Sequence, residues 1–382
     1  MPKFLEGIRV LDFTQILSGP FATMLLADAG AEVVKVERPK SGDPTRHWGP
    51  PFIEDESIYF AAFNRGKHSV ELDLKKTEDL NRLRDLACTA DVIVENIRPG
   101  SLEKHGLAYR DLCKLNPRLI YVSIRGYSEH STRANDPGLE VIMEAESGLM
   151  SITGPGEGGD PVRLGVAAID MMTGVFAVSW IYSLLYQRER TGQGGYAAVS
   201  LEETTALMMT HPWLMYLKAG MDYKASGTAH PSIAPYEVFR TQDKRLMLGA
   251  VDDAQFERLA HLLGVSDWLQ RPEWATNSQR VENRLQLHQA IEEHLLTNTA
   301  EYWREKLAEA KLPVGIVEPV SSAAKQWSES QMPRLHANHP TLGALEWPGS
   351  PGMSRDGEVC PPPLLGDWNE LVFRKWFTTG RG

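Results

Sequence analysis

The stretch that decides the fold lies near the N-terminus and has three parts: Ile8-Arg-Val-Leu-Asp-Phe13, Pro20-Phe-Ala-Thr-Met-Leu-Leu-Ala-Asp-Ala29 and Glu32-Val-Val-Lys-Val-Glu37. The first and last parts are short, Val-containing apolar runs, which are typical of buried strands. The middle part has the features of a helix, because Pro20 stands in its first turn and Gly30 follows its end. Together they predict one βαβ unit.

The same alternation continues along the chain. Further strands are predicted at Ser69–Leu74, Asp91–Glu95 and Leu119–Ile124, with helices at 77–88 and 109–115 between them. Alternating strands and helices favour a parallel sheet covered by helices, so we expect an α/β fold with a Rossmann-like large domain. After long apolar helices at 169–190 and 203–219, new strand and helix patterns from Gly227 predict a smaller α/β domain. The Pro- and Gly-rich tail at 336–366 predicts extended strands and turns.

The domain boundaries follow from these changes of pattern. At 382 residues the chain is long enough for two domains. We expect a large domain at 1–200, a linker helix at 201–226, a small domain at 227–325 and a return to the large domain at 326–382.

Composition excludes several classes of protein. The 42% hydrophobic and 24% charged residues are typical of a globular chain, and the net charge of −10 argues against general nucleic-acid binding. We find no basic leader and no uncharged apolar run of about 18 residues, so we expect a cytoplasmic protein with no membrane span. Cys88, Cys113 and Cys360 are too widely spaced for a disulfide framework or a metal site, and Cys88 is predicted to lie in the core.

Asp170 is an acid at the start of the long apolar helix predicted at 169–190, in Arg163-Leu-Gly-Val-Ala-Ala-Ile-Asp-Met-Met-Thr-Gly174. One interpretation is a helix N-cap, because Asp accepts hydrogen bonds from the free N–H groups of a first helical turn. The other is an ionised nucleophile that attacks an activated carbonyl and forms a covalent acyl intermediate. The local sequence leaves both open.

Basic residues gather in the first domain despite the negative net charge. This cluster of basic residues predicts a binding site for a ligand with several phosphates, and coenzyme A is one candidate ligand. The alternative is that these side chains lie on a solvated surface. The first βα turn, Thr14–Pro20, places small residues at a helix N-terminus, where backbone N–H groups can receive a phosphate; it is not GxGxxG. The basic residues are Lys35, Arg38, Lys40, Arg46, Arg65, Lys67, Lys75, Lys76, Arg98 and Lys104.

The chain resembles the class III CoA-transferase family, also called CaiB/BaiF, over essentially its whole length. The order and spacing of several short motifs carry this resemblance. They are Leu17-Ser-Gly-Pro-Phe-Ala22, Gly30-Ala-Glu-Val-Val-Lys-Val-Glu-Arg38, Gly42-Asp-Pro-Thr-Arg46, Asn64-Arg-Gly-Lys67, Glu95-Asn-Ile-Arg-Pro-Gly100, Ser147-Gly-Leu-Met150 and Arg190-Thr-Gly-Gln-Gly194. The resemblance implies that Asp170 is the nucleophile, and that two subunits form a homodimer of interlocked rings.

The resemblance also implies a reaction and its binding residues. Asp170 would attack an acyl-CoA to give a mixed anhydride and then an aspartyl-CoA thioester, with coenzyme A as a substrate and no permanently bound cofactor or metal. The implied coenzyme A contacts are Arg38, Leu72, Leu74, Lys75, Asn96, Ile97, Arg98, Lys104 and His105. Gly249 matches a glycine-rich loop that the family has near its active site, although this segment has only one glycine. The other candidates for the substrate pocket are Leu17, His230 and Glu140, which could orient Asp170 or a substrate.

One departure from the family bears on the choice of reaction. Leu139-Glu140 stands where many of its transferases have Tyr-Asp and the related α-methylacyl-CoA racemases have His-Asp. Racemisation needs a second titratable group opposite the aspartate, and Leu139 cannot be that group. Glu140 is expected to be a partly exposed carboxylate. A racemase and a non-catalytic acyl-CoA-binding protein stay as alternatives to a transferase.

The acceptor is expected to be a dicarboxylic acid. Gly227-Thr-Ala-His-Pro-Ser-Ile-Ala-Pro-Tyr236 and Pro361-Pro-Pro-Leu-Leu-Gly366 are similar to family members of the succinate–hydroxymethylglutarate type. The second carboxylate of such a substrate would need a cationic side chain to bind it. Each candidate for this role could instead form a structural salt bridge or lie on the surface. The candidates are Arg46, His47, Arg163 and His230.

Overall fold

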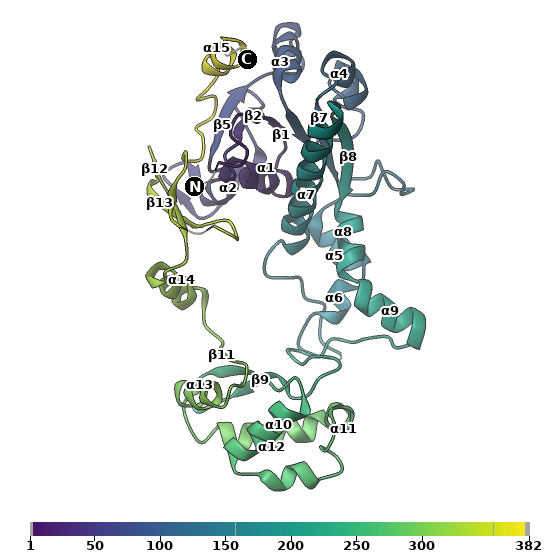
Figure 1. Ribbon diagram of the computed structural model, residues 1–382, viewed down its shortest axis with the longest axis vertical. Coiled ribbons are helices and arrows are strands. Elements are labelled where there is room, and N and C mark those ends of the chain that lie inside the picture. Colours follow the sequence, from purple (N-terminus) through teal and green to yellow (C-terminus); the bar gives the residue numbers. More distant parts are fainter. Residues whose placement is uncertain (1–2, 157, 354, 379–382) are drawn as a thin grey trace. The chain divides into compact units, whose positions relative to one another are not determined.

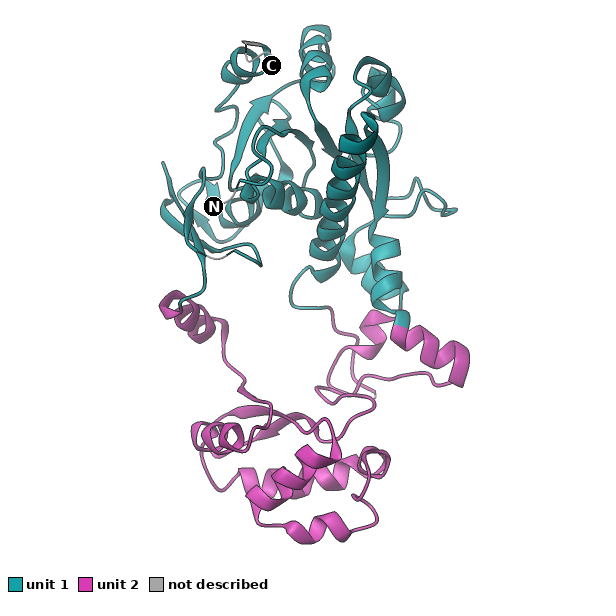
Figure 2. Ribbon diagram, viewed as in Figure 1, with its two compact units in different colours: residues 1–147, 164–210, 331–382 teal, residues 148–163, 211–330 magenta. Residues whose placement is uncertain are grey.

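The structure is a computed structural model that describes residues 3–156, 158–353 and 355–378. The chain divides into two compact units (Figure 2). Unit 1 comprises residues 1–147, 164–210 and 331–382, and unit 2 comprises residues 148–163 and 211–330. This division is based on contacts within each unit, and the domain boundaries expected from the sequence remain a prediction.

A parallel six-stranded sheet forms the centre of unit 1 (Figure 1). Its strands are β1 (Arg9–Phe13), β2 (Glu32–Glu37), β5 (Lys67–Glu71), β6 (Val92–Glu95), β7 (Ile120–Arg125) and β8 (Gly195–Ser200). Their order across the sheet is β5-β2-β1-β6-β7-β8, and every neighbouring pair is parallel. Numbered in chain order within the sheet, this is 3-2-1-4-5-6, the order of a doubly wound fold. The order reverses between β1 and β6, where such sheets bind their ligands.

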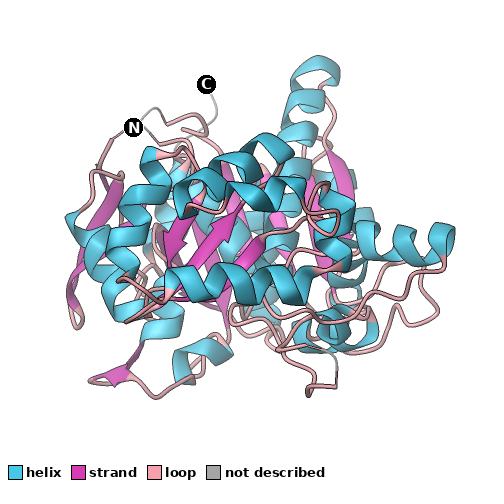
Figure 3. Ribbon diagram, turned by 90° about the horizontal axis from the view of Figure 1, so that it is seen from below, coloured by secondary structure: helices cyan, strands magenta, loops and turns pink. Residues whose placement is uncertain are grey.

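Helices cover both faces of the sheet (Figures 1 and 3). On one face α1 (Ser18–Asp28) and α7 (Ala168–Thr191) share a hydrophobic cluster with β1, β2, β6, β7 and β8. On the other face α3 (Thr77–Thr89), α4 (Tyr109–Leu115) and α15 (Leu371–Thr378) share a second cluster. Alternate residues of β7 divide between the two clusters, as the period of a strand requires. The α/β fold expected from the sequence is confirmed.

Helix α7 positions the candidate nucleophile and is unusually apolar. Among the described helices it alone is long and apolar enough to cross a membrane, which is weak evidence of a span. It packs against α1, β7 and β8, so it is a core helix on one side. Its other side leaves Val175, Trp180, Tyr182 and Tyr186 exposed.

Smaller elements complete unit 1. They are η1 (Pro44–His47), β3 (Phe52–Ile53), β4 (Glu56–Ser57), α2 (Ile58–Phe63), η2 (Glu103–His105), α5 (Glu140–Glu146) and α8 (Leu201–Met208). The tail forms a sheet of β12 (Arg334–His339), β13 (Gly343–Pro348) and β14 (Gly357–Glu358), so strands and turns are confirmed there, with residue 354 outside the described residues. The prediction for Cys88 is wrong, because its side chain is exposed at the end of α3.

Unit 2 contains an antiparallel sheet in the order β11-β10-β9 and a core of its own. Its strands are β9 (Tyr236–Arg240), β10 (Arg245–Gly249) and β11 (Val314–Ile316). Its helices are α6 (Leu149–Ile152), α9 (Thr210–Ala219), α10 (Asp253–Leu263), η3 (Ser266–Gln270), α11 (Asn277–Glu282), α12 (Arg284–Leu295), α13 (Ala300–Glu309) and α14 (Val320–Glu329). The single helix predicted at 203–219 is two helices, α8 and α9, because Pro212 cannot continue a helix across this point.

Candidate active site

Asp170 lies in the first turn of α7. The N-cap residue of that helix is Ala167, which makes no capping side-chain bond, so the N-cap interpretation of Asp170 is wrong. Oδ1 of Asp170 instead accepts a hydrogen bond from the hydroxyl of Ser18, the first residue of α1. The carboxylate therefore lies where the first turns of two helices meet.

Gly174 allows the first turns of α1 and α7 to lie this close together. It stands four residues after Asp170, so the two share a face of α7. A Cβ at position 174 would lie 2.7 Å from the backbone oxygen of Ser18. Because only glycine avoids that clash, α7 can approach the first turn of α1 closely enough for the carboxylate to reach the Ser18 hydroxyl.

Asp170 is half-buried, and its surroundings act on its charge in opposite directions. Burial raises the pKa of Asp170 above its ordinary value, and the hydrogen bond from Ser18 acts in the opposite direction. The positive ends of two helix dipoles also lie at the carboxylate, because it belongs to the first turn of α7 and bonds to the first turn of α1. The site thus holds a desolvated carboxylate with one fixed donor.

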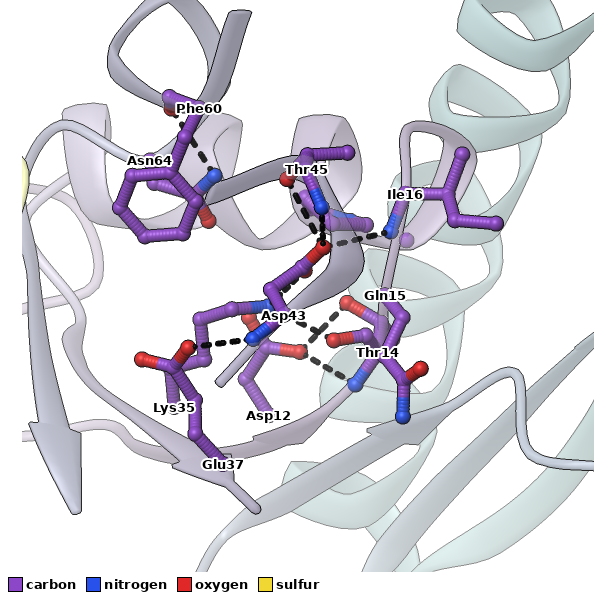
Figure 4. Close-up of polar contacts among 12 residues, drawn as sticks. Asp12, Thr14, Gln15, Ile16, Lys35, Glu37, Asp43, Thr45, Phe60 and Asn64 are labelled. Atoms are coloured by element: carbon purple, nitrogen blue, oxygen red, sulfur yellow. Dashed lines mark hydrogen bonds and ion pairs between the residues drawn. The ribbon is translucent and has the colours of Figure 1, made fainter. Parts of the chain in front are cut away.

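The loop between β1 and α1 is held by hydrogen bonds to side chains, and Figure 4 labels two of these acceptors, Asp12 and Asp43. The N–H of Thr14 donates to Asp12 at 2.8 Å, that of Gln15 to Asn96 at 2.8 Å, and that of Ile16 to Asp43 at 3.4 Å. The Asn96 amide in turn donates to the Gln15 carbonyl at 2.7 Å. These three N–H groups, expected from the sequence to receive a phosphate, therefore have partners within the protein.

Four of the basic residues expected at a phosphate site are structural instead. Lys35 pairs with Asp43 at 2.9 Å and Lys67 with Asp12 at 3.2 Å, and all four side chains are fully buried. Burial lowers the pKa of Lys67 to about 8 despite its pairing with Asp12. Arg46 and Arg65 are also committed, since each makes two hydrogen bonds to a buried carboxylate. For these four cations the predicted contact with phosphate is wrong, and Arg46 is not free to clamp a substrate.

The residues implied to contact coenzyme A lie after the carboxyl ends of neighbouring strands. Because parallel strands end at the same edge, the structure brings these segments to one edge of the sheet. Arg38 follows β2; Leu72, Leu74 and Lys75 follow β5; Asn96, Ile97 and Arg98 follow β6; and Lys104 and His105 belong to η2. Arg38, Lys75, Arg98 and Lys104 are exposed. Leu72 is only 4% exposed and belongs to the core, so a ligand contact there would fall to its backbone.

Two cavities adjoin the segment after β6 and share Ile97, Arg98, Pro99 and Arg125. One, of about 390 Å³, is lined also by Asn96, Gly126 and residues 134–138. The other, of about 250 Å³, is lined by three tyrosines, Tyr109, Tyr121 and Tyr196, and by Glu95. Burial raises the pKa of Glu95 to about 7, although Ser123 and the N–H of Ile97 donate hydrogen bonds to it. The segment Asn96–Arg98 thus has space on two sides for a ligand.

The residues implied to form the substrate pocket are divided between the units. Leu17 is 2% exposed, and Glu140, the first residue of α5, is 9% exposed, so the expectation of a partly exposed Glu140 is wrong. Leu139 before it is exposed. In unit 2, Gly249 ends β10 and His230 packs against Tyr236. Burial, followed by the charge of Arg284, lowers the pKa of His230.

Other features of the site were only partly visible in the sequence. The role of Ser18 was missed, although its place in a Ser-Gly-Pro motif at a predicted helix start was a signal. Of the remaining clamp candidates, His47 bonds to the Ser41 carbonyl through Nε2, and Arg163 is exposed. Within the described ranges no group of three or more His, Cys, Asp or Glu side chains is arranged to hold a metal ion.

Comparison with known proteins gives the family. Residues 5–367 match the model of CoA-transferase family III. The chain belongs to this family. It is therefore an enzyme of the CoA-transferase class, which acts on acyl-CoA and carboxylic acids.

Two relatives and one solved structure are similar to this chain over most of its length. Succinyl-CoA:glutarate CoA-transferase of Mus musculus is 40% identical over 380 residues, which cover 98% of this chain and 86% of that protein. Succinate–glutarate CoA-transferase of Agrobacterium fabrum is 38% identical over 338 residues, covering 86% of this chain and 82% of that protein. A CaiB/BaiF family protein from Brucella suis has a TM-score of 0.84 at 32% identity, covering 97% of this chain and 99% of that one.

Proposed function

We propose that this CoA-transferase moves coenzyme A from an acyl-CoA such as succinyl-CoA to a short dicarboxylic acid, with Asp170 as the nucleophile. The observation that carries the proposal is the Asp170 carboxylate, fixed by Ser18 just after the carboxyl end of β1. The family and the names of the two glutarate-using relatives support the substrates. Asn96 supports the connection to coenzyme A, because it joins the segment after β6 to the loop that leads to Ser18.

The reaction runs through two covalent intermediates. A carboxylate oxygen of Asp170 attacks the thioester carbonyl, and the C–S bond breaks to release CoA thiolate and leave a mixed anhydride. The thiolate attacks the aspartyl carbonyl and expels the donor acid, which gives an aspartyl-CoA thioester. The acceptor carboxylate then attacks this thioester, and the returning thiolate takes the acceptor acyl group and frees Asp170. These steps balance without a redox group, so a permanently bound cofactor is not required.

Coenzyme A binding is assigned to the edge of the sheet described above. Four exposed cations of that edge are proposed contacts, because phosphates favour charge-assisted hydrogen bonds to such side chains; they are Arg38, Lys75, Arg98 and Lys104. Leu74, Ile97 and His105 border the same segments, and the cavities beside Ile97 offer room for the apolar part of the ligand. We also propose four residues for the acyl pocket, namely Leu17, Glu140, Gly249 and His230.

The proposal includes a cytoplasmic homodimer of interlocked rings. Its support is the apolar outer side of α7, where Val175, Trp180, Tyr182 and Tyr186 are each more than 40% exposed. Aromatic side chains gathered on one surface are typical of subunit interfaces. Size-exclusion chromatography with light scattering tests this part separately, and a monomer would contradict it.

An isotope experiment tests the nucleophile. When the acceptor is a dicarboxylate labelled with ¹⁸O, the steps above leave an acceptor oxygen on Asp170, so mass spectrometry should find ¹⁸O in the peptide carrying that residue. Asp170→Asn should lower turnover at least about 10⁴-fold while the protein stays folded.

The substrates are tested with succinyl-CoA, acetyl-CoA and formyl-CoA against a panel of mono- and dicarboxylates. Transfer without label in Asp170, or full activity of Asp170→Asn, would refute the mechanism.

A further inference from the structure

We propose that the Ser18 hydroxyl acts on the reacting carboxylate throughout the cycle: it holds Oδ1 of Asp170, leaves Oδ2 to attack, and stabilises the oxyanion that later forms on Oδ1. The inference rests on the proposed function, because it assigns a role within the same site. Ser18 was not among the residues that the sequence implied.

The geometry supports a fixed donor. Ser18 is 6% exposed and is the first residue of α1, and its hydroxyl donates to Oδ1. Among the described residues this is the only hydrogen bond made to the Asp170 carboxylate. The loop before Ser18 is pinned by Asp12, Asn96 and Asp43, and Gly174 contacts the Ser18 backbone from α7. The donor and the acid are therefore each held by independent contacts.

The charge of the site depends on the same bond. Burial raises the pKa of Asp170, and the Ser18 hydrogen bond opposes this rise without cancelling it. Burial and this bond are the causes of the shift, to which no cation of the described residues is added. Removal of the hydroxyl would leave a desolvated carboxylate without a donor, so its pKa would rise further and a smaller fraction would be ionised at a given pH.

The electron movements explain why a donor at Oδ1 helps beyond the ground state. Oδ2 forms a bond to the acyl carbon of the thioester while the C–S bond breaks and thiolate leaves. Oδ1 is then the carbonyl oxygen of the aspartyl half of the anhydride. When thiolate attacks Cγ, the π electron pair moves onto Oδ1, and its return expels the donor acid together with Oδ2. The hydroxyl already aimed at Oδ1 stabilises that negative charge, as an oxyanion donor does.

A kinetic experiment separates this role from simple packing. Purified enzyme is mixed with succinyl-CoA without acceptor, and the rate at which Asp170 acquires coenzyme A is followed by quenched-flow mass spectrometry across pH. Ser18→Ala should slow adduct formation about 10²-fold, the cost of losing one oxyanion donor. The acid limb of its rate profile should move to higher pH, since ionised Asp170 is needed. Ser18→Thr, which keeps a hydroxyl, should return the limb toward that of the native enzyme.

The control removes a comparable bond elsewhere. Ser350 donates to Asp28 at the opposite end of α1, so Ser350→Ala loses a hydroxyl–carboxylate bond at the same helix without touching Asp170. It should leave both the rate and the acid limb unchanged. If Ser18→Ala does not fold, Ser18→Cys, with its weaker donor, must show an intermediate shift.

The outcomes distinguish the two proposals. If the native enzyme forms the adduct on Asp170 and the acid limb of Ser18→Ala or Ser18→Cys stays in place, the role of Ser18 is overturned and the proposed function stands. If the native enzyme transfers coenzyme A without ever forming the adduct on Asp170, both are overturned.

Discussion

Gly174→Ala tests the close approach of α7 to α1 on which the position of Asp170 depends. An added Cβ would lie 2.7 Å from the backbone oxygen of Ser18 and 3.1 Å from the ring of Phe21. Because the nearest atom belongs to the backbone, no side-chain rotation relieves the clash. Ordinary contact begins near 3.4 Å, so the two helices must separate by about 0.7 Å, the difference between 3.4 and 2.7 Å.

Stability and activity should respond differently to this shift. Ala is favoured over Gly inside a helix by about 1 kcal/mol, whereas overpacking a tight site costs about 1–3 kcal/mol. The free energy of unfolding should therefore fall by no more than about 2 kcal/mol, and the protein should fold. A displacement near 1 Å at a reacting group costs about 10²-fold, so kcat should fall about 10- to 100-fold.

The assay is the steady-state rate of transfer from succinyl-CoA to glutarate, with urea unfolding as the measure of stability. Gly174→Val should be worse than Gly174→Ala in both. Gly315→Ala is the matched control, because a Cβ added at that position in β11 meets open space, and it should keep native kcat. A folded Gly174→Ala enzyme with native kcat would refute the argument that this contact sets the geometry of Asp170.

Three further predictions concern charge. Lys67→Met leaves the buried Asp12 without its partner and should lower the free energy of unfolding by about 3–5 kcal/mol in urea; a loss below about 1 kcal/mol would show that the pair does not stabilise the fold. The pKa of Glu95 is raised by burial from 4.5 to about 7, so the folded state binds the extra proton and stability is lost as pH rises between those values, by about 1.4 kcal/mol per unit. Glu95→Gln should remove this slope, and an unchanged slope in unfolding measured from pH 5 to 8 would contradict the assignment. Arg98→Ala and Lys104→Ala should each raise the KM for acyl-CoA about 10-fold and make that KM less dependent on salt. The KM for the acceptor should not change. Equal effects on both KM values would argue against phosphate contacts.

Local pattern was enough to find most of the sheet. The Val-rich run Glu32–Glu37 forms a strand with those same bounds, and Gly30 ends the preceding helical segment as expected, because apolar periodicity and helix punctuation are local properties. Strand β8 was missed, since Gly195-Tyr-Ala-Ala-Val-Ser200 contains a single β-branched residue and begins at the second glycine of the pair Gly194-Gly195. It is a strand because β7 provides hydrogen bonds along its length.

The candidate site was harder to predict because charge partners are distant in sequence. Lys35 and Lys67 resemble phosphate ligands when they are read as isolated charges, yet each neutralises a buried aspartate. Asp12 reaches Lys67 across 55 positions, and no local pattern records such a pair. Asp170 could be singled out, because an acid at the start of an apolar helix is conspicuous. Its donor Ser18 was missed, because no local pattern connects the Ser-Gly-Pro motif to an acid 152 positions away.

Ser18 and Asp170 are separated by 152 positions in the chain, and this distance affects how the protein is made. During synthesis the hydroxyl leaves the ribosome long before the acid, and neither segment is equipped for chemistry alone. The proposed reactivity of Asp170 toward thioesters therefore requires α7 to pack against α1. On this proposal, a chain that ends before α7 contains the hydroxyl without the acid and should form no adduct with acyl-CoA.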